Sequence, residues 1–371
     1  MPYPPTDGES LVIMNDVRVL KRLGHTVFLF CLNTEKHWVD TAGYSQNLAW
    51  DGFMCVNYFP DSLKSYSRSL FSSRPLQLAR FYSSDTEIRM KDYLVHRGID
   101  LIIYQGLAMT QYLKDEVVKK LYRVHNLESR IWYNLAKNSR YPHKKFLYSH
   151  IAASLEKYET LHLSCMSAIV ALSHEEKSIF ENYYSDRTLA TIAISLPLAP
   201  LKTYKEERQG ILFMGSLDWL PNREGLNWFL QKVYPAIKHI PLTLAGKGQF
   251  ICNLENVRVI PNFEHKEDLL NTHKCMIVPL LSGAGIRIKI IEAMQFGLPI
   301  ISTSIGSEGI ESIADSIIIE NNSDKWIRLI QELYCDDSMR IILSENLVTS
   351  YQAYYSEEQV AKKWENLMSK L

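Results

Sequence analysis

The segment Ser282–Met294, SGAGIRIKIIEAM, combines residue types that together could bind an anion. Its apolar residues recur at helical spacing and Gly-Leu-Pro follows, which predicts a helix that begins just after Gly283 and Gly285. Arg287 and Lys289 fall in its first turn, where the partial positive charge of a helix N-terminus disfavours cations. Free backbone N–H groups, glycines that permit close approach and two cations together favour a bound phosphate.

The two cations differ in how well a phosphate explains them. Lys289 lies three residues before Glu292, so a surface ion pair explains it equally well. Arg287 has no acidic residue at that spacing, and we expect it to contact the phosphate. The two side chains are about 200° apart on an ideal helix, so both reach one anion only if the first turn is irregular.

A second loop has the same form. The predicted strand Gly210–Met214 ends at Gly215 and Ser216, and a helix follows Asn222. Asn222 is equally suited to cap that helix, and Gly215-Ser216 to a simple turn. Taken with the first loop, this one predicts a diphosphate held between strand ends.

Short apolar segments alternate with amphipathic ones along the chain, which predicts α/β domains with parallel sheets covered on both faces. We expect two doubly wound, Rossmann-like domains at 1–196 and 209–355, joined by a linker at 197–208. A final helix at 356–371 would follow. Because ligands bind at the carboxyl ends of such strands, the site is expected in a cleft between the domains.

The first domain begins unusually. The chain opens with PYPPTDGES, which is typical of the loop after a strand, whereas doubly wound domains open with the strand itself. Another segment could fill that position. We expect instead that the first strand, of about ten residues, is missing from this chain, because a gap in the sheet would leave backbone groups unpaired.

Composition narrows the classes of function. The formal net charge is +0, which argues against a nucleic-acid partner. The 6 cysteines form no paired motif, which favours reduced thiols and a cytoplasmic protein. No apolar run approaches the roughly 18 residues of a membrane span. No acidic cluster follows a predicted strand, so neither a metal nor another cofactor is expected.

Several blocks of the chain resemble glycosyltransferase family 4, which comprises retaining enzymes of the GT-B fold. In the second half they are ILFMGSLDWLPNREGLNWFLQKVYP, LTLAGKG, NVRVIPNF and SGAGIRIKIIEAMQFGLPIISTSIGSEGI. In the first half PYPPTDGES, LKRLGHTVFLF, RVHNLES and IVALSHEE match more loosely. The resemblance implies a donor-binding C-terminal domain and a last helix that crosses back to the first domain.

The resemblance also implies roles for individual residues. Glu292 matches a family glutamate that binds the nucleotide ribose, and His125 a histidine that faces the donor sugar. Gly8 matches the glycine loop near the donor phosphate and the acceptor. Phe263 lies where the family holds the base, although a core position explains it equally well. The remaining donor-binding residues would be Gly215, Ser216, Asn222, Gly283, Ala284, Gly285, Ile286 and Lys289.

The chain departs from the family pattern at three places. Ala284 stands where many members carry a glutamate that contacts the donor sugar, which leaves the sugar open. Glu9 replaces a common second glycine, and the usual Arg and Lys are not evident after the strand that ends at Met214. Arg287 would supply that positive charge. The block resembles a subfamily with a G-x-R-x-K-x-x-E-A pattern.

The resulting hypothesis is a retaining, metal-independent hexosyltransferase. It would move a sugar from a nucleoside diphosphate sugar to an acceptor hydroxyl during polysaccharide or glycan assembly, with His125, Arg287 and Glu292 as its catalytic residues. Epimerisation or hydrolysis would need a further acid–base pair, which we do not find. A non-catalytic scaffold of the same fold is the alternative, and loss of nucleotide binding would favour it.

The acceptor is expected on the N-terminal domain and would be a glycan or a lipid-linked sugar. Ser62–Ser84 contains no acidic residue and holds Lys64, Arg68, Arg74 and Arg80 among aromatic and aliphatic residues. This composition favours contact with an anionic membrane surface or a lipid-diphosphate acceptor. A solvated amphipathic helix explains it slightly better. The protein would act in the cytoplasm, in part at the inner face of the membrane.

Overall fold

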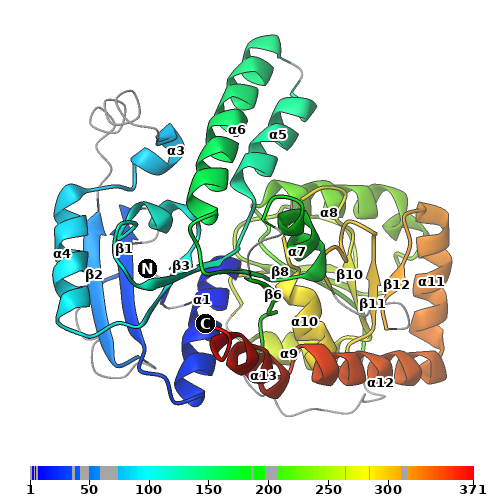
Figure 1. Ribbon diagram of the computed structural model, residues 1–371. Coiled ribbons are helices and arrows are strands. Elements are labelled where there is room, and N and C mark those ends of the chain that lie inside the picture. The colour runs from blue at the N-terminus through cyan, green and yellow to red at the C-terminus, as the bar shows by residue number, and fades with distance from the viewer. Residues whose placement is uncertain are drawn as a thin grey trace. The chain divides into compact units, whose positions relative to one another are not determined.

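The computed structural model describes residues 2–371 except for 4, 6, 36–37, 42–49, 59–73, 140, 185–187, 197–207, 264, 284 and 311–315. The chain divides into two compact units (Figure 1). Unit 1 comprises Met1–Ile194 with Ala361–Leu371, and unit 2 comprises Ser195–Val360. Most of the expected linker, 197–207, lies outside the described residues.

Unit 2 is built on a 6-stranded parallel sheet in the order β12-β11-β10-β7-β8-β9. Its central strands are apolar and fully buried because helices cover both faces, as in β7 and β10. The strands are β7 (Ile211–Met214), β8 (Leu242–Gly246), β9 (Val257–Pro261), β10 (Cys275–Val278), β11 (Ile300–Ser302) and β12 (Ile318–Ile319).

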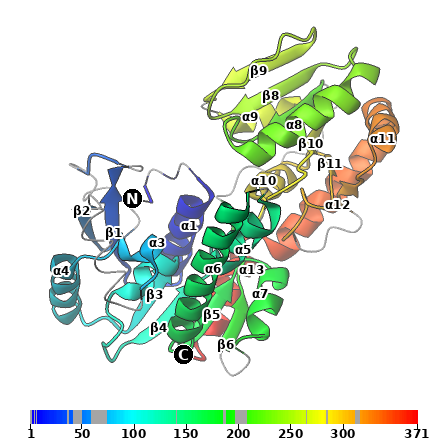
Figure 2. The same ribbon diagram turned by 90° about the horizontal axis from the view of Figure 1, so that it is seen from above.

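The helices of unit 2 bury apolar stripes against this sheet. Trp326 of α11 and Phe229 of α8, both 0% exposed, meet edge to face in the core. Figure 2 shows α11 and α12 on the side of the unit where β11 lies. The helices are α8 (Leu220–Lys232), the 3₁₀ turn η3 (Tyr234–Ala236), α9 (Lys266–Thr272), α10 (Ile288–Gln295), α11 (Ser323–Cys335) and α12 (Asp337–Tyr354).

Unit 1 divides its described strands between two parallel sheets. One pairs β1 with β2, and the other has the order β3-β4-β5-β6. Among the described residues no strand joins β1 to β3, and the first element is the helix α1. The strands are β1 (Phe28–Thr34), β2 (Gly52–Tyr58), β3 (Leu101–Gln105), β4 (Lys119–Arg123), β5 (Ala168–Ala171) and β6 (Thr188–Thr191).

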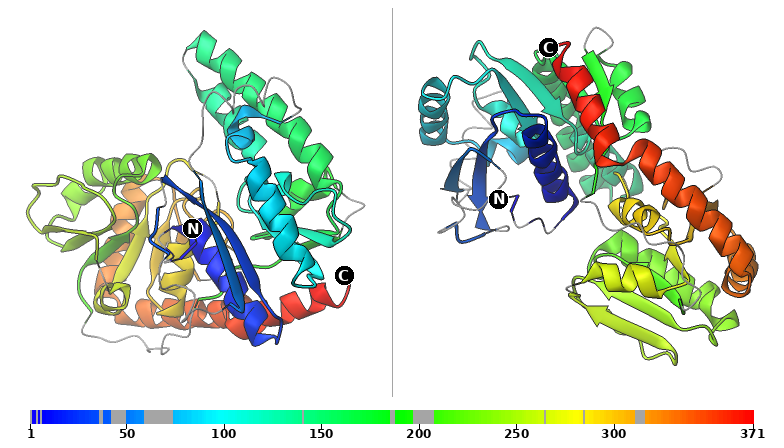
Figure 3. Two further views of the ribbon diagram at one scale, coloured as in Figure 1. Left: turned by 90° about the vertical axis from the view of Figure 1, so that its left-hand side faces the viewer. Right: turned by 90° about the horizontal axis from the view of Figure 1, so that it is seen from below.

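The last helix of the chain returns to unit 1, as expected. Residues Ala361–Leu371 belong to that unit, and α13 lies beside α1 (Figures 1 and 3). Trp364 is fully buried there, and the Arg123 guanidinium lies 5.7 Å from the centroid of its ring. The helices are α1 (Gly8–Arg22), α3 (Leu76–Ala79), α4 (Ser84–Val95), η2 (Leu107–Gln111), α5 (Glu128–Asn138), α6 (Pro142–Leu163), α7 (His174–Glu181) and α13 (Glu357–Met368).

The predicted α/β class with parallel sheets is confirmed. The sequence pattern over Thr110–Lys119 also predicts a helix, and that prediction is wrong. That stretch contains only the end of the 3₁₀ turn η2, in which the Thr110 hydroxyl donates to the Leu107 carbonyl. Leu113 then has φ of 54°, a left-handed conformation that ends any helix. The helix α5 was not predicted from the sequence, although Ile131, Trp132, Leu135 and Ala136 recur at helical spacing.

Candidate functional site

Lys289 lies against the backbone at the end of β7. It is the second residue of α10, and its Nζ donates to Asn222 Oδ1 at 3.2 Å. A Cβ atom built on Gly215 would come within 2.7 Å of this Nζ, so only glycine leaves room for the ammonium group there. The same Nζ lies 4.9 Å from the centroid of the Phe213 ring. The structure therefore brings together the two glycine loops that were predicted to form one site.

Arg287 lies just outside the helix rather than in its first turn, which corrects the sequence prediction. It is the N-cap residue of α10, with φ of −91° and ψ of 77°. Its side chain is buried, and Nη2 donates to the Ile305 carbonyl at 3.3 Å. A Cβ on Gly283 would lie 3.4 Å from Nη2, so the guanidinium passes directly beneath the glycine loop. Because Arg287 is not helical, the ideal separation of about 200° between its side chain and that of Lys289 does not apply, and both could reach one anion.

The charges of these two residues affect each other. Desolvation, together with the nearby Arg287, lowers the pKa of Lys289 to about 7, while Glu292 opposes the shift. Desolvation also lowers the pKa of Arg287, while Glu308 opposes it. The site thus holds a cation whose charge is incompletely stabilised by the protein, and an anion would complete it.

Asn222 organises the second loop but does not cap the helix. The N-cap of α8 is Trp219, without a side-chain hydrogen bond, and Asn222 is the third helical residue. Its Nδ2 donates to the Ser216 carbonyl at 2.7 Å, while its Oδ1 accepts from Lys289. Asn222 is 2% exposed, so one amide fixes both the loop and the ammonium group.

Glu292 pairs with a lysine other than the one that its spacing suggested. Its Oε1 lies 2.6 Å from Lys266 Nζ, at the start of α9, and the carboxylate is largely buried. The structure does not show the alternative pair with Lys289. Since Lys266 holds Oε1, the side chain is fixed in one orientation.

The other predicted donor residues of unit 2 follow the strands β7, β9 and β10 in the chain. Gly283 and Gly285 have φ of 118° and 86°, which only glycine adopts without strain, and Ile286 is half-buried beside them. Phe263 is half-buried two residues beyond β9. Ser216 is exposed. Ala284 lies outside the described residues.

In unit 1, His125 follows β4 by two residues and is 9% exposed. Its Nε2 lies 2.7 Å from Gln105 Oε1, an oxygen that can only accept, so Nε2 carries the proton. Desolvation, together with the nearby Arg123, lowers the pKa of His125 to about 3, while Asp7 opposes the shift. His125 is therefore neutral near pH 7, and its Nδ1 is an acceptor.

Three residues around His125 were not predicted from the sequence. Gln105 Nε2 donates to Asp16 Oδ2 at 3.1 Å, and Arg123 Nε donates to the same oxygen at 3.0 Å. Asp16 and Arg123 are at most 1% exposed. Local sequence carries no signal for this buried ion pair, because α1 and β4 each contain further charged residues, among them Arg18 and Lys120.

Gly8 is the first residue of α1, directly after its N-cap, and is exposed. Asp7 caps the helix by accepting from the Ser10 N–H at 2.9 Å, and the Ser10 hydroxyl accepts from the Asp7 N–H at 3.0 Å. This reciprocal pair fixes the loop in which Gly8 lies. Gly8 was predicted to lie in a glycine loop, whereas in the structure it is the first residue of the helix α1.

Within the described part of the chain, no helix is long and apolar enough to cross a membrane. The same residues contain no group of three or more His, Cys, Asp or Glu side chains arranged to hold a metal ion. The cysteines are free, and they differ in burial. Cys31 and Cys275 are buried, whereas Cys165 and Cys335 are exposed.

Comparison with known proteins places the site within a described family of domains. Residues 208–336 match the family described as glycosyl transferases group 1. An uncharacterised 44.6 kDa protein in the cps region of Klebsiella pneumoniae is 25% identical over 339 residues, which cover 83% of this chain and 82% of the relative.

Solved structures with low sequence identity share the fold. Sucrose-phosphate synthase from Thermosynechococcus elongatus has a TM-score of 0.69 at 15% identity, over 100% of this chain and 96% of that one. Anabaena HepE in complex with UDP has a TM-score of 0.66 at 12% identity, over 98% and 97%.

Proposed function

We propose that this chain is a glycosyltransferase of family 4 with the GT-B fold, and that it transfers a sugar from a nucleoside diphosphate sugar to an acceptor hydroxyl. The observation that carries the proposal is the Lys289 ammonium group, held against Gly215 beside the buried Arg287. Two close cations beneath glycine loops repel each other until an anion lies between them, and a diphosphate fits that requirement.

The diphosphate is also the group on which charge develops during the reaction. As the bond between the sugar and the diphosphate breaks, the leaving oxygen becomes more negative, and preorganised cations lower the energy of that state. Lys289 and Arg287 would act there together with backbone N–H groups of the Gly283–Ile286 loop. No metal ion is needed for this role, because the two side chains supply positive charge.

The remaining residues would position the donor. Lys266 fixes the Glu292 carboxylate through Oε1, which would leave Oε2 to accept from the ribose hydroxyls. Phe263 would contact the base, as the family resemblance implies. His125, neutral and with Nε2 bound to Gln105, would accept a sugar hydroxyl at Nδ1.

Further support comes from related proteins. The relative in Klebsiella pneumoniae is a protein of the cps region, which supports a role in capsular or other cell-surface polysaccharide assembly. The complex of HepE with UDP supports a nucleotide donor. Retention of the anomeric configuration, and a cytoplasmic site of action on a glycan or lipid-linked acceptor, follow from the family resemblance.

Calorimetric titration of the full chain with UDP, GDP, ADP and their common sugars tests the proposal. We expect one nucleotide to bind selectively and Arg287→Ala to weaken it about 10- to 100-fold, the effect of losing one charge-assisted hydrogen bond. Arg223→Ala, at an exposed position of α8, is the matched control and should bind normally. If no nucleotide binds to the folded chain, the scaffold alternative replaces the proposal.

A further inference from the structure

A helical hairpin extends from unit 1 and takes no part in the site described above. Its helices, α5 and α6, run antiparallel, and their joined ends lie far from the four-stranded sheet (Figures 1 and 3). Trp132 and Tyr148 meet edge to face at 5.5 Å between ring centroids, and the Tyr133 hydroxyl donates to Glu156 at 2.8 Å. These contacts make the hairpin a defined structural element.

The base of the hairpin is anchored in the core of unit 1. Leu155 and Tyr158 of α6 are at most 2% exposed and belong to the core cluster around β3, β4 and β5. The buried Glu159 accepts from the Ser129 N–H at 3.3 Å, which joins the start of α5 to α6. The far end is therefore carried on a rigid support.

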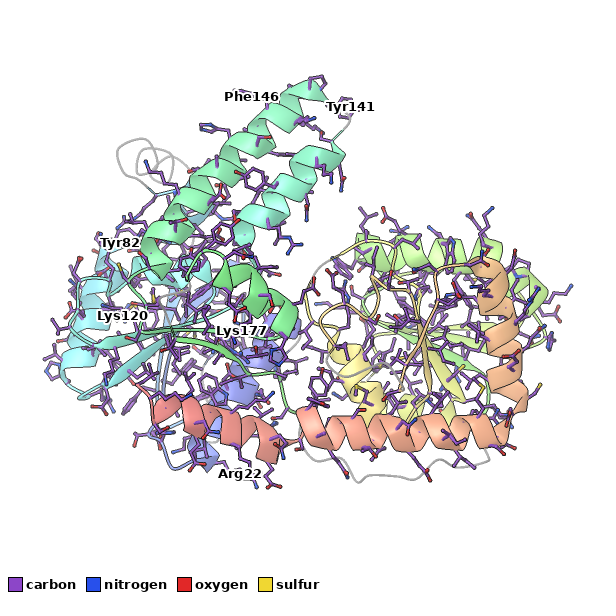
Figure 4. The ribbon with its side chains drawn as sticks, turned by 45° about the vertical axis from the view of Figure 1, so that its right-hand side comes forward. Arg22, Tyr82, Lys120, Tyr141, Phe146 and Lys177 are labelled. Atoms are coloured by element: carbon purple, nitrogen blue, oxygen red, sulfur yellow. The ribbon has the colours of Figure 1, made fainter. Side chains whose placement is uncertain are left out.

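The far end exposes large apolar side chains that the fold does not use. Phe146 is 78% exposed, Tyr141 58% and Leu147 53%. Figure 4 shows Tyr141 and Phe146 together at the end of the hairpin, directed away from the body of unit 1. Exposed apolar side chains grouped at a protruding end mark a docking site rather than a folding requirement.

The charge of the hairpin identifies what would dock there. Residues 129–155 contain no Asp or Glu, although the whole chain has a formal net charge of +0. The same range holds the cations Arg130, Lys137, Arg140, Lys144 and Lys145, together with His143 and His150. Lys144 and Lys145 precede Phe146 at the start of the helix α6, and both are exposed. A basic segment free of acids is complementary to an anionic surface.

We propose that the end of this hairpin, Tyr141–Leu147, docks on an anionic lipid bilayer. Phe146 and Leu147 would enter the boundary between headgroups and acyl chains, and Lys144 and Lys145 would contact lipid phosphates. This is peripheral contact, since no described helix could span the bilayer. It would bring unit 1, where the acceptor is expected, to the membrane surface.

The proposal assigns membrane contact to a different segment from the one that the sequence indicated. Of Ser62–Ser84, residues 62–73 lie outside the described structure. Farther along, the Arg74 guanidinium stacks 3.7 Å from the Tyr82 ring centroid, and Tyr82 stacks on Tyr112. Those aromatic side chains already have partners within the protein, whereas Phe146 is directed into solvent.

Flotation of the full chain with vesicles tests the proposal. We expect binding to vesicles of phosphatidylcholine mixed with phosphatidylglycerol, weaker binding at high salt, and little binding to phosphatidylcholine alone. Phe146→Ser with Leu147→Ser, and separately Lys144→Glu with Lys145→Glu, should each lower the bound fraction at least tenfold. All four positions are exposed, so the circular dichroism spectrum and the melting temperature, which report the fold, should not change.

Matched controls on unit 2 separate this site from a general effect of charge or apolar area. Ile341→Ser with Ile342→Ser replaces two exposed side chains of α12, and Lys232→Glu with Lys238→Glu reverses two exposed cations. Both should bind vesicles normally. The proposal is wrong if the unmodified chain does not bind anionic vesicles, or if hairpin and control variants behave alike.

Sedimentation of the same variants tests the competing occupant, a second copy of this chain. If the apolar hairpin variant converts an oligomer to a monomer while vesicle binding is unchanged, the hairpin is an interface between copies and the lipid proposal fails. Vesicle binding does not require a nucleotide. Its failure would therefore leave the transferase proposal intact, and failure of nucleotide binding would leave this one intact.

Discussion

The two candidate sites handle charge in opposite ways. In unit 2, Lys289 and Arg287 are desolvated side by side, and the lowered pKa of each shows that the protein stabilises their charges incompletely. In unit 1, the buried Arg123 meets its counter-charge Asp16 at 3.0 Å, and His125 is held neutral. A bound anion would balance the charges of Lys289 and Arg287 in unit 2. The site in unit 1 already has balanced charges and offers hydrogen-bond donors and acceptors.

This difference matches the division of work expected in a sugar transferase. The donor carries a diphosphate, which needs positive charge, and the reacting sugar and acceptor carry hydroxyl groups, which need neutral donors and acceptors. The scaffolds differ as well. Unit 2 carries one sheet of 6 strands, while the described strands of unit 1 form sheets of 2 and 4.

The largest effect is expected from breaking the buried ion pair of unit 1. Arg123→Leu would leave Asp16 buried without its cation and should lower the free energy of unfolding of unit 1 by about 3–5 kcal/mol. Scanning calorimetry with and without the bound nucleotide would identify the transition of unit 1 as the one that the ligand shifts less.

The control for this prediction also removes the charge of the Asp16 carboxylate, which Arg123→Leu leaves unpaired. Arg123→Leu combined with Asp16→Asn should recover part of the lost stability, because no carboxylate is then left unpaired. Equal stability of Arg123→Leu and the unmodified chain would show that the pair contributes nothing, and the contrast between the two sites would disappear.

A smaller effect is expected at Lys289, on donor binding. Lys289→Met should weaken the nucleotide about 10- to 100-fold. Because the pKa of Lys289 is lowered to about 7, the free protein loses this proton as pH rises above 7, whereas the bound anion favours the protonated form. Affinity should therefore be highest below pH 7 and fall above it.

Calorimetry at pH 8 in two buffers of different ionisation enthalpy would count the protons involved. The unmodified chain should take up about one proton per bound donor, and Lys289→Met none. Lys289→Arg keeps its charge at every relevant pH and should also take up none while retaining most of the affinity. Equal proton uptake in all three proteins would show that Lys289 is already charged in the free site.

The smallest effect is expected at His125, on the transfer rate. His125→Ala should lower kcat by about tenfold, the effect of one hydrogen bond, and His125→Asn should retain more activity. Since desolvation lowers the pKa of His125 to about 3, the residue stays neutral between pH 5 and 8. Its substitution should therefore leave the shape of the pH–rate profile unchanged. An inflection near pH 6.5 that His125→Asn removes would contradict the neutral site.

Much of the geometry of the candidate donor site could be predicted because its parts are local in sequence. The loops around Gly215 and Gly283 carry their signals in residue type, and parallel strands place such loops at one edge of a sheet. The predicted partner of Glu292 was wrong because the actual contact is not local in sequence. Helical spacing indicated Lys289, but Lys266 arrives from α9, and no local pattern contains that contact.

The sequence alone determined the alternation of strands and helices, the two-domain organisation that it implies, and the positions of the glycine loops and their cations. These follow from periodicity and residue type, which act over a few neighbouring residues. Only the tertiary structure decided which charges are desolvated, that His125 is bound to Gln105, and that Phe146 is directed into solvent. Burial and ionisation depend on groups far apart in the chain, so they are set only when the chain has folded.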